Sequence, residues 1–296
     1  MSLPAVLSAF RQLVLDGIEL PASAREREAL IRRSFEGLSE EEVQDLSKME
    51  PARLQVYTSS VFSAEGNILL NAFPLTLAAL EQFWPEEWGA YSRRVVAQRV
   101  HRFAPWRGIH STTLGESFLQ FLSGECGQVR RQVPWLLEAG QLEQAMLEVR
   151  RAPNEGRRPQ KPEDLASLST ASVGELLALT VEVPSLLRGV ELEHDLLPIR
   201  RAVLEGEALR AATERTIRLL CARPHDLGVA CVEVPQGVWE LLLERRGQAC
   251  ELSELAEAYL ASPDAASLGD DEAFRGFYAM FHSLVGAGSC SLGSVC

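Results

Sequence analysis

A short run in the second half of the chain, Glu191-Leu-Glu-His194, has residue types that could bind a metal ion. Glu-x-x-His is the spacing by which di-iron helical bundles place two ligands on one helix face. Such sites need two copies of the motif and two further carboxylates, whereas this sequence has one copy. We therefore expect Glu191 and His194 to belong to an acidic surface cluster, and we predict no metal site in this chain.

The remaining reactive side chains do not form a known catalytic pattern. His101 and His110 flank Pro105, and the six cysteines include no CxxC pair and no zinc-ligand spacing. The sequence also lacks a Gly-x-Ser-x-Gly elbow, an HExxH motif, a phosphate-binding glycine loop and a dinucleotide fingerprint. We predict a chain that is not a catalyst, binds no cofactor and keeps its thiols unpaired in the cytoplasm.

Composition limits the partners that we expect. The 296 residues suit two domains, and 46% of them are hydrophobic, which is enough to form a core. A net charge of −12 without a basic stripe argues against nucleic-acid binding. No run approaches the roughly 18 apolar residues of a membrane span, and the N-terminal segment has amphipathic helix spacing without signal-peptide features.

The first half of the chain predicts a helical bundle. Two or three short helices precede residue 50, among them one over about 24–35 and one that starts at Ser39. Phe73-Pro74 predicts a break, because proline cannot occupy a helix interior but suits a first helical position. The further helices expected are one ending near Ala72, one over about 74–82, one over about 86–103, one capped by Thr113 and Glu116, and one over about 132–151.

The second half predicts a smaller α+β module. Residues 177–183 alternate as a strand does, residues 195–204 return to helix, and 216–223 with 228–234 form a β-hairpin. Helices are expected over about 235–245, 252–260 and 272–284, the last capped by Asp270 or Asp271. The fold class is therefore mostly α (α+β). The expected division is a helical bundle (1–151), a Pro-rich linker (152–163), a winged-helix-like module (164–288) and a flexible tail (289–296).

The chain resembles a family of partner subunits, labelled as a DNA-binding domain, that accompany multinuclear non-haem iron oxidative enzymes, as in methanobactin biosynthesis. The resemblance covers about residues 50–190, with its bundle core at about 50–151 and a weaker echo near Trp239. Glu81 departs from it, because the family commonly has Gly after the equivalent leucine. The matching residues are Arg53-Leu54-x-Val56-Tyr57, Ala72-Phe73-Pro74-x-Thr76, Phe118-x-x-Phe121-Leu122, Pro134-Trp135-Leu136, Leu142-Glu143, Ala145, Ala152-Pro153 and Pro184-Ser185-Leu186.

The resemblance implies a heterodimer with a TIM-barrel iron enzyme that supplies all the iron and the chemistry, while this chain binds a ribosomally made precursor peptide. An edge strand of the hairpin could take up such a peptide as an added strand. The hairpin residues expected to bind the peptide are Ile217, Leu219, Cys221, Val229, Cys231 and Val232. The aromatic residues expected at the enzyme interface are Tyr57, Trp84 and Trp106.

Several alternatives stay open. The hairpin could be an ordinary closed one without a ligand, and the aromatic residues could all be bundle core. The chain could also be a winged-helix-like DNA-binding regulator, for which Arg245-Arg246 is the only basic pair beside a helix of the module. A third alternative is a metalloenzyme that acts alone.

Overall fold

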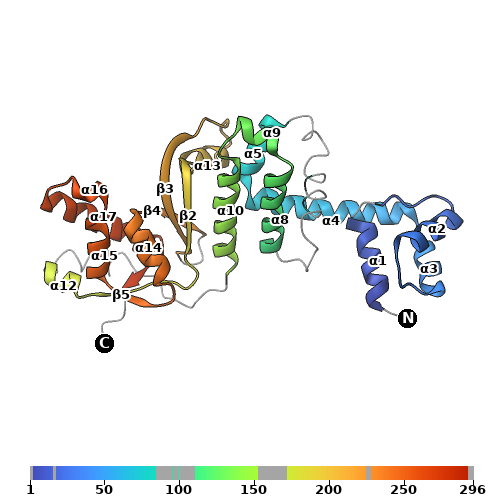
Figure 1. Ribbon diagram of the computed structural model, residues 1–296, viewed down its shortest axis with the longest axis horizontal. Coiled ribbons are helices and arrows are strands. Elements are labelled where there is room, and N and C mark those ends of the chain that lie inside the picture. Colours follow the sequence, from blue (N-terminus) through green and yellow to red (C-terminus); the bar gives the residue numbers. More distant parts are fainter. Residues whose placement is uncertain are drawn as a thin grey trace. The chain divides into compact units, whose positions relative to one another are not determined.

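The computed structural model describes residues 3–15, 18–84, 96, 100, 111–152, 172–224 and 228–292 (Figure 1). The chain divides into two compact units, Met1–Leu137 and Glu138–Cys296. The described part of the first unit is helical, and the second contains two three-stranded antiparallel sheets. This confirms a mostly α (α+β) fold. In the described segments, no helix has both the length and the apolar character that crossing a membrane requires.

Three short helices begin the first unit, as predicted. They are α1 (Leu3–Leu15), α2 (Ala24–Ser34) and α3 (Glu40–Ser47). Apolar residues of these helices and of the start of the next helix form one core, in which the side chains of Leu13 and Ile31 are completely buried. Burial of such side chains is the main source of stability for helices this short.

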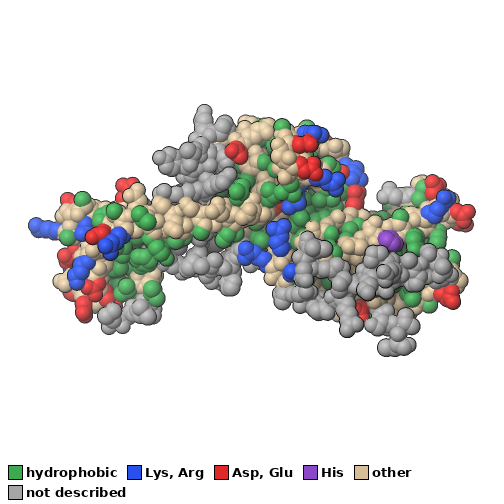
Figure 2. Space-filling model, turned by 180° about the vertical axis from the view of Figure 1, so that it is seen from behind, with side chains coloured by type: hydrophobic (Ala, Val, Ile, Leu, Met, Phe, Trp, Pro, Cys, Tyr) green, Lys and Arg blue, Asp and Glu red, His purple; other side chains and the backbone are tan. Residues whose placement is uncertain are grey.

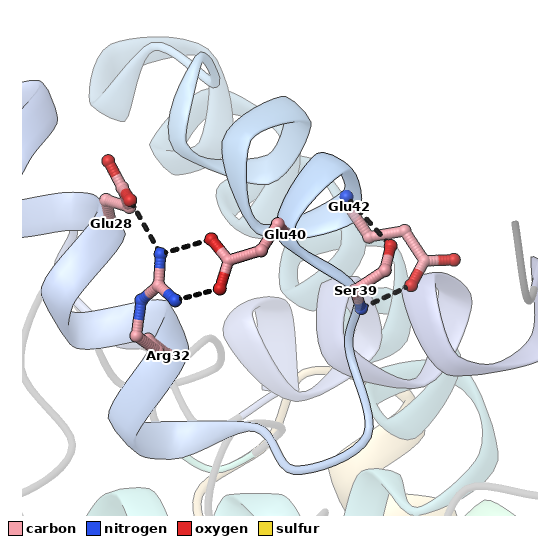
Figure 3. Close-up of polar contacts among 5 residues, drawn as sticks. All are labelled: Glu28, Arg32, Ser39, Glu40 and Glu42. Carbon is pink, nitrogen blue, oxygen red and sulfur yellow. Dashed lines mark hydrogen bonds and ion pairs between the residues drawn. The ribbon is translucent and has the colours of Figure 1, made fainter.

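The junction between α2 and α3 is fixed by polar contacts (Figure 3). The Ser39 hydroxyl accepts from the Glu42 N–H at 3.3 Å, and the Glu42 carboxylate accepts from the Ser39 N–H at 2.8 Å. This capping box satisfies two backbone donors at the start of α3. Arg32 of α2 donates to both Glu40 and Glu28, and its guanidinium lowers the pKa of Glu40.

The break at Phe73-Pro74 lies where it was predicted. Helix α4 (Pro51–Ala72) ends one residue before Phe73, and α5 (Pro74–Phe83) begins with Pro74 at its first position. The Phe73 N–H donates to Leu69 O at 2.7 Å, and Phe73 O accepts from the Leu77 N–H at 2.9 Å. The Phe73 side chain is completely buried and meets the Phe118 ring edge-on, with centroids 4.8 Å apart.

Two helix starts in this region differ from the prediction. Helix α8 (Ser111–Gly124) begins two residues before Thr113, so the Thr113–Glu116 cap was wrong. The helix predicted over 132–151 is instead α9 (Gly127–Gln132) followed by α10 (Leu136–Arg151), because Pro134 interrupts it. The helix predicted over 86–103 lies outside the described residues, except Val96 and Val100, which are buried.

The first sheet of the second unit has the strand order β2-β3-β4. Its strands are β2 (Arg188–Asp195), β3 (Thr213–Ala222) and β4 (Ala230–Glu233). The predicted hairpin is therefore confirmed as β3–β4, whereas β2 was not predicted. Helix α13 (Leu197–Leu204) follows β2 where a helix was expected.

Helix α10 runs antiparallel to β2. Its Glu148 pairs with Arg188 at the start of the strand (2.7 Å), and its Glu138 pairs with His194 near the strand's end (2.9 Å). These contacts place α10 in the second unit, although the sequence analysis grouped residues up to 151 with the bundle. The predicted linker lies outside the described residues from 153 onward.

The second sheet has the order β5-β1-β6 and joins segments far apart in the sequence. Its strands β1 (Thr180–Glu182), β5 (Ala249–Glu251) and β6 (Ser291–Leu292) share one core with neighbouring helices. Those helices are α12 (Val173–Leu177), α14 (Gln236–Glu244), α15 (Leu252–Leu260), α16 (Pro263–Ala266) and α17 (Asp270–Gly286).

The end of the described chain is ordered, which corrects the prediction of a flexible tail from 289. Residues Ser291 and Leu292 pair with β1, and Cys290 is 2% exposed. Gly288 makes the turn into β6 with a φ of 69°, and a Cβ there would lie 2.9 Å from the Cα of Pro224. Both the conformation and the space therefore require glycine. Helix α17 is capped by Gly269 rather than by Asp270 or Asp271.

Candidate functional site

The hairpin residues predicted to bind a peptide fall into two groups. Ile217, Leu219 and Cys221 lie on the central strand β3 and are at most 1% exposed. Val229, Cys231 and Val232 lie on or just before β4 and are partly exposed.

Strand β3 cannot accept an added strand over its predicted residues. Ile217, Leu219 and Cys221 pair with Leu192, Val190 and Arg188 of β2, and β4 pairs with residues 219–222 on the other side. Which edge of the hairpin is free could not be predicted from the sequence, because β2 was not predicted. With β2 in place, the hairpin edge that remains is the outer edge of β4. No strand of the described segments pairs with that edge.

The backbone groups at the outer edge of β4 follow from the register. The Val234 N–H donates to Arg218 O at 3.0 Å, so these two residues form a hydrogen-bonded pair. Pairs alternate along an antiparallel ladder, and Val232 therefore also points its N–H and C=O toward β3. The N–H and C=O groups of Cys231 and Glu233 point outward. An incoming extended peptide would bind to these outward groups.

The two faces of this sheet carry different side chains. The face that we call the cysteine face carries Val190, Leu192, Ile217, Leu219, Cys221 and Cys231. The opposite face, the α14 face, carries Leu220, Ala222 and Val232, and these pack in one core with Val238 and Leu242 of α14. Apolar side chains are therefore buried on both faces of the sheet, as expected from a hairpin sequence in which neither face is uniformly polar.

An ion-pair network lies at the Glu233 end of β4. Arg215 donates to both carboxylate oxygens of Glu233 (2.7 and 2.9 Å) and to Asp195 of β2 (3.0 Å). Hydrogen bonds to Glu233 and then Asp195 raise the pKa of Arg215. The network joins all three strands across the sheet, so it holds β4 in position while its outer edge stays unpaired.

The Glu191–His194 run lies on strand β2, where Glu191 and Glu193 are exposed and His194 is partly buried. Its His194 side chain is 15% exposed and contacts Glu138, while Glu191 pairs with Arg218 at 2.9 Å. In the part of the chain that the structure describes, no three His, Cys, Asp or Glu side chains are placed to hold a metal ion.

The predicted interface aromatics have different environments. Tyr57 is 51% exposed beside Val56, which is 70% exposed, and its ring lies 5.5 Å from that of Phe10. Trp84 is partly buried and stacks on Phe121 at 6.3 Å. Trp106 lies outside the described residues.

An apolar surface surrounds Tyr57. Leu7 of α1 is 55% exposed, and α1 contacts α4, which carries Val56 and Tyr57. Figure 2 shows hydrophobic side chains gathered over α1. We call Leu7, Val56 and Tyr57 the α1–α4 surface. Tyr57 was predicted from the sequence and Leu7 was not, because Leu7 falls on the apolar face of the N-terminal helix and was expected to be buried.

Two of the predicted peptide-binding residues form a pair that was not predicted. Cys221 and Cys231 are directly opposite each other, with their sulfur atoms 2.9 Å apart. Counting back from the turn of the predicted hairpin would place Cys221 opposite Ala230, one residue away from the observed register, so the sequence alone does not predict this pairing.

Comparison with known proteins gives no family for this chain. No family model matches the sequence, and no curated protein matches it significantly.

Proposed function

We propose that this chain is a non-catalytic partner subunit that binds a ribosomally made precursor peptide and presents it to a TIM-barrel multinuclear iron oxidative enzyme. The enzyme would hold the iron and perform the oxidation, and the complex would work in the cytoplasm. The family resemblance over about 50–190 supplies the identity of the partner. The outer edge of β4 is the structural observation that carries the peptide-binding part.

A peptide added at β4 would extend the sheet to four strands. The outward N–H and C=O groups of Cys231 and Glu233 would provide hydrogen bonds that do not depend on the peptide's sequence. Selectivity would come from side chains beside the edge, where Val229 and Val232 offer partly exposed apolar surface. A variable cargo is compatible with such a mode, because main-chain pairing provides most of the contacts.

The finer description of the second unit belongs to this proposal. Helices α14, α15 and α17 with the sheet β5-β1-β6 have the composition of a winged-helix-like module. We propose that this module supports the β2-β3-β4 sheet from its α14 face. The α1–α4 surface of the first unit would contact the enzyme, since exposed apolar and aromatic groups are common at protein interfaces.

A proline pair tests the peptide site. Cys231→Pro removes an N–H that points outward, so it should weaken peptide binding and leave the hairpin folded. Val232→Pro removes an N–H that bonds to β3 and should destabilise the hairpin itself. Cys231→Ala controls for loss of the thiol.

The measurement is the affinity of each variant for the precursor peptide encoded beside the iron enzyme, by fluorescence anisotropy. Folding is checked in parallel by circular dichroism. Equal affinities for folded Cys231→Pro and Cys231→Ala would exclude β4 as the peptide site. Failure of the chain to co-purify with the enzyme in any ratio would exclude the partner-subunit role itself.

A further inference from the structure

The two cysteines of the β3–β4 hairpin form a site that the proposed function does not use. Cys221 of β3 and Cys231 of β4 have their sulfur atoms 2.9 Å apart, and both are free thiols. Cys221 is completely buried, whereas Cys231 is partly exposed on the edge strand. Of the two residues, Cys231 therefore lies nearer to solvent, and Cys221 lies behind it.

The register gives this pair the backbone geometry of a cross-strand disulfide. Because Arg218 and Val234 are a hydrogen-bonded pair, Leu219 and Glu233 are not, and the alternation makes Cys221 and Cys231 a non-hydrogen-bonded pair. Cα atoms of such pairs lie about 4.5 Å apart, which falls within the range of about 4.4–6.8 Å that a disulfide spans. No movement of the strands is required to join the sulfur atoms.

The surroundings assign different roles to the two sulfur atoms. The hydrogen bond with Cys221, and the positive charge of Arg200 from α13, lower the pKa of Cys231. The same hydrogen bond and burial raise the pKa of Cys221. Arg200 is held against the fully buried Glu143 of α10 at 3.5 Å. Because Cys231 is also the less buried of the two residues, we assign it the role of the attacking thiolate.

We propose that Cys221 and Cys231 are a reversible oxidation site, which closes to a cross-strand disulfide by exchange with a low-molecular-weight disulfide such as glutathione disulfide. The Cys231 thiolate attacks one sulfur of the reagent, forming a mixed disulfide and releasing one glutathione thiolate. Cys221 then gives up its proton and attacks the Cys231 sulfur, which releases the second glutathione. Two protein thiols are oxidised, and one glutathione disulfide is reduced to two glutathione molecules.

The site is independent of the proposed function, because the exchange needs neither peptide nor enzyme. Its effect would fall on β4. A covalent link between β3 and β4 would hold the edge strand in place, so amide exchange at residues 230 and 232, whose N–H groups point toward β3, should slow on oxidation.

The test is disulfide mapping on the full folded chain, equilibrated with defined ratios of glutathione disulfide to glutathione and then alkylated. Trypsin cleaves after Arg218 and Arg245, and a second protease cleaves before Asp226. These cuts put Cys221 in 219–225 and Cys231 in 226–245, with no other cysteine in either peptide. We expect the two peptides to stay joined until a reductant is added.

Two results would overturn the inference. The peptides could separate at every ratio, with Cys231 carrying either glutathione or the alkylating group. In a Cys231→Ala variant, whose fold is checked by circular dichroism, Cys221 should take up glutathione at least tenfold more slowly than the wild-type pair closes. Uptake at the same rate would show that Cys231 is not the attacking thiol.

Discussion

Removing the Glu138 carboxylate should expose how the sheet protects its β2 edge. One oxygen of Glu138 accepts from the N–H of Glu193 at 2.8 Å and from the N–H of His194 at 3.1 Å. Its other oxygen lies 2.9 Å from Nδ1 of His194. The register of β2 on β3 shifts between Leu192 and His194, as in a β-bulge. At this shift the Glu138 carboxylate accepts from the strand N–H groups that a neighbouring strand would otherwise bind.

The cost of Glu138→Ala follows from the exposure of the groups left behind. Glu193 is exposed and its N–H can turn to water, whereas the His194 amide is partly buried and would lose its partner. One unsatisfied buried donor costs about 1–3 kcal/mol, and we expect a loss of unfolding free energy in that range. Glu138→Gln keeps one acceptor oxygen and should lose less.

Glu148→Ala is the matched control on the same helix. It removes the ion pair between Glu148 and Arg188, whose side chains are 30% and 36% exposed, and a hydrogen bond from Gln144 Nε2 at 3.0 Å, but it leaves no strand N–H without an acceptor. Such a pair is worth about 0–1 kcal/mol. Urea denaturation gives the free energies, and amide hydrogen exchange over residues 188–195 locates the effect. If Glu138→Ala costs no more than Glu148→Ala, or if exchange at residues 193 and 194 is unchanged, Glu138 does not cap the edge.

Three further changes have defined outcomes. Gly189→Ala should lower the melting temperature of the second unit, because the added Cβ would lie 2.8 Å from Nε1 of Trp239. Overpacking of this kind typically costs about 1–3 kcal/mol of unfolding free energy. A melting temperature equal to that of the wild type would show that the indole moves aside freely. In a denaturation series, Phe73→Ala should lower the free energy of unfolding by about 3–5 kcal/mol, because Phe73 is completely buried. Pro74→Ala should lower it only slightly, because alanine continues a helix. The reverse order would contradict the proposed break at Phe73-Pro74. The ion pair of Glu40 with Arg32 stabilises the folded state at pH values above the ordinary carboxyl pKa of 4.5, and this stabilisation is lost as the pH falls through the lower pKa of the folded state. The difference in melting temperature between wild type and Glu40→Gln should therefore shrink on acidification. A difference that does not change with pH would contradict this prediction.

The sequence predicted best those elements that local chemistry determines. The α4–α5 break follows from the backbone of one proline, and helix α15 has the predicted bounds, Leu252–Leu260. The start of α3 follows from Ser39 and the acidic residues after it. Each of these signals acts within a few residues, so no tertiary information is needed to read it.

The errors share a different cause, which is that distant partners decide the structure. Strand β2 was missed because its Glu191 and Glu193 suggested an acidic surface, although Val190 and Leu192 alternate with them and are buried. The Gly- and Ser-rich end is ordered because Ser291 and Leu292 find a partner in β1. The alternation in β2 was a local signal that the acidic residues obscured, whereas the order of the chain end depends on pairing with a distant strand and cannot be read from a local pattern.

At the candidate peptide-binding site, the β3–β4 hairpin could be predicted from the sequence, but the unpaired edge of its sheet could not. Which edge of β3–β4 is open depends on β2 and on α10, and both were assigned differently from the sequence. The predicted residues of β3 are therefore core, and those of β4 remain candidates for peptide binding.

The sheet β5-β1-β6 also constrains the order of events during synthesis. Its central strand β1 is made first, yet it pairs with residues 249–251 and 291–292. Closing loops of this length costs entropy before any contact stabilises them, and contacts between distant residues slow folding. The helices of the first unit meet neighbours close in sequence and can fold while the ribosome is still translating. Strand β5 becomes available before β6, so completion of the second unit must wait until residue 292 has left the exit tunnel, and until then Val181 lacks its second neighbouring strand.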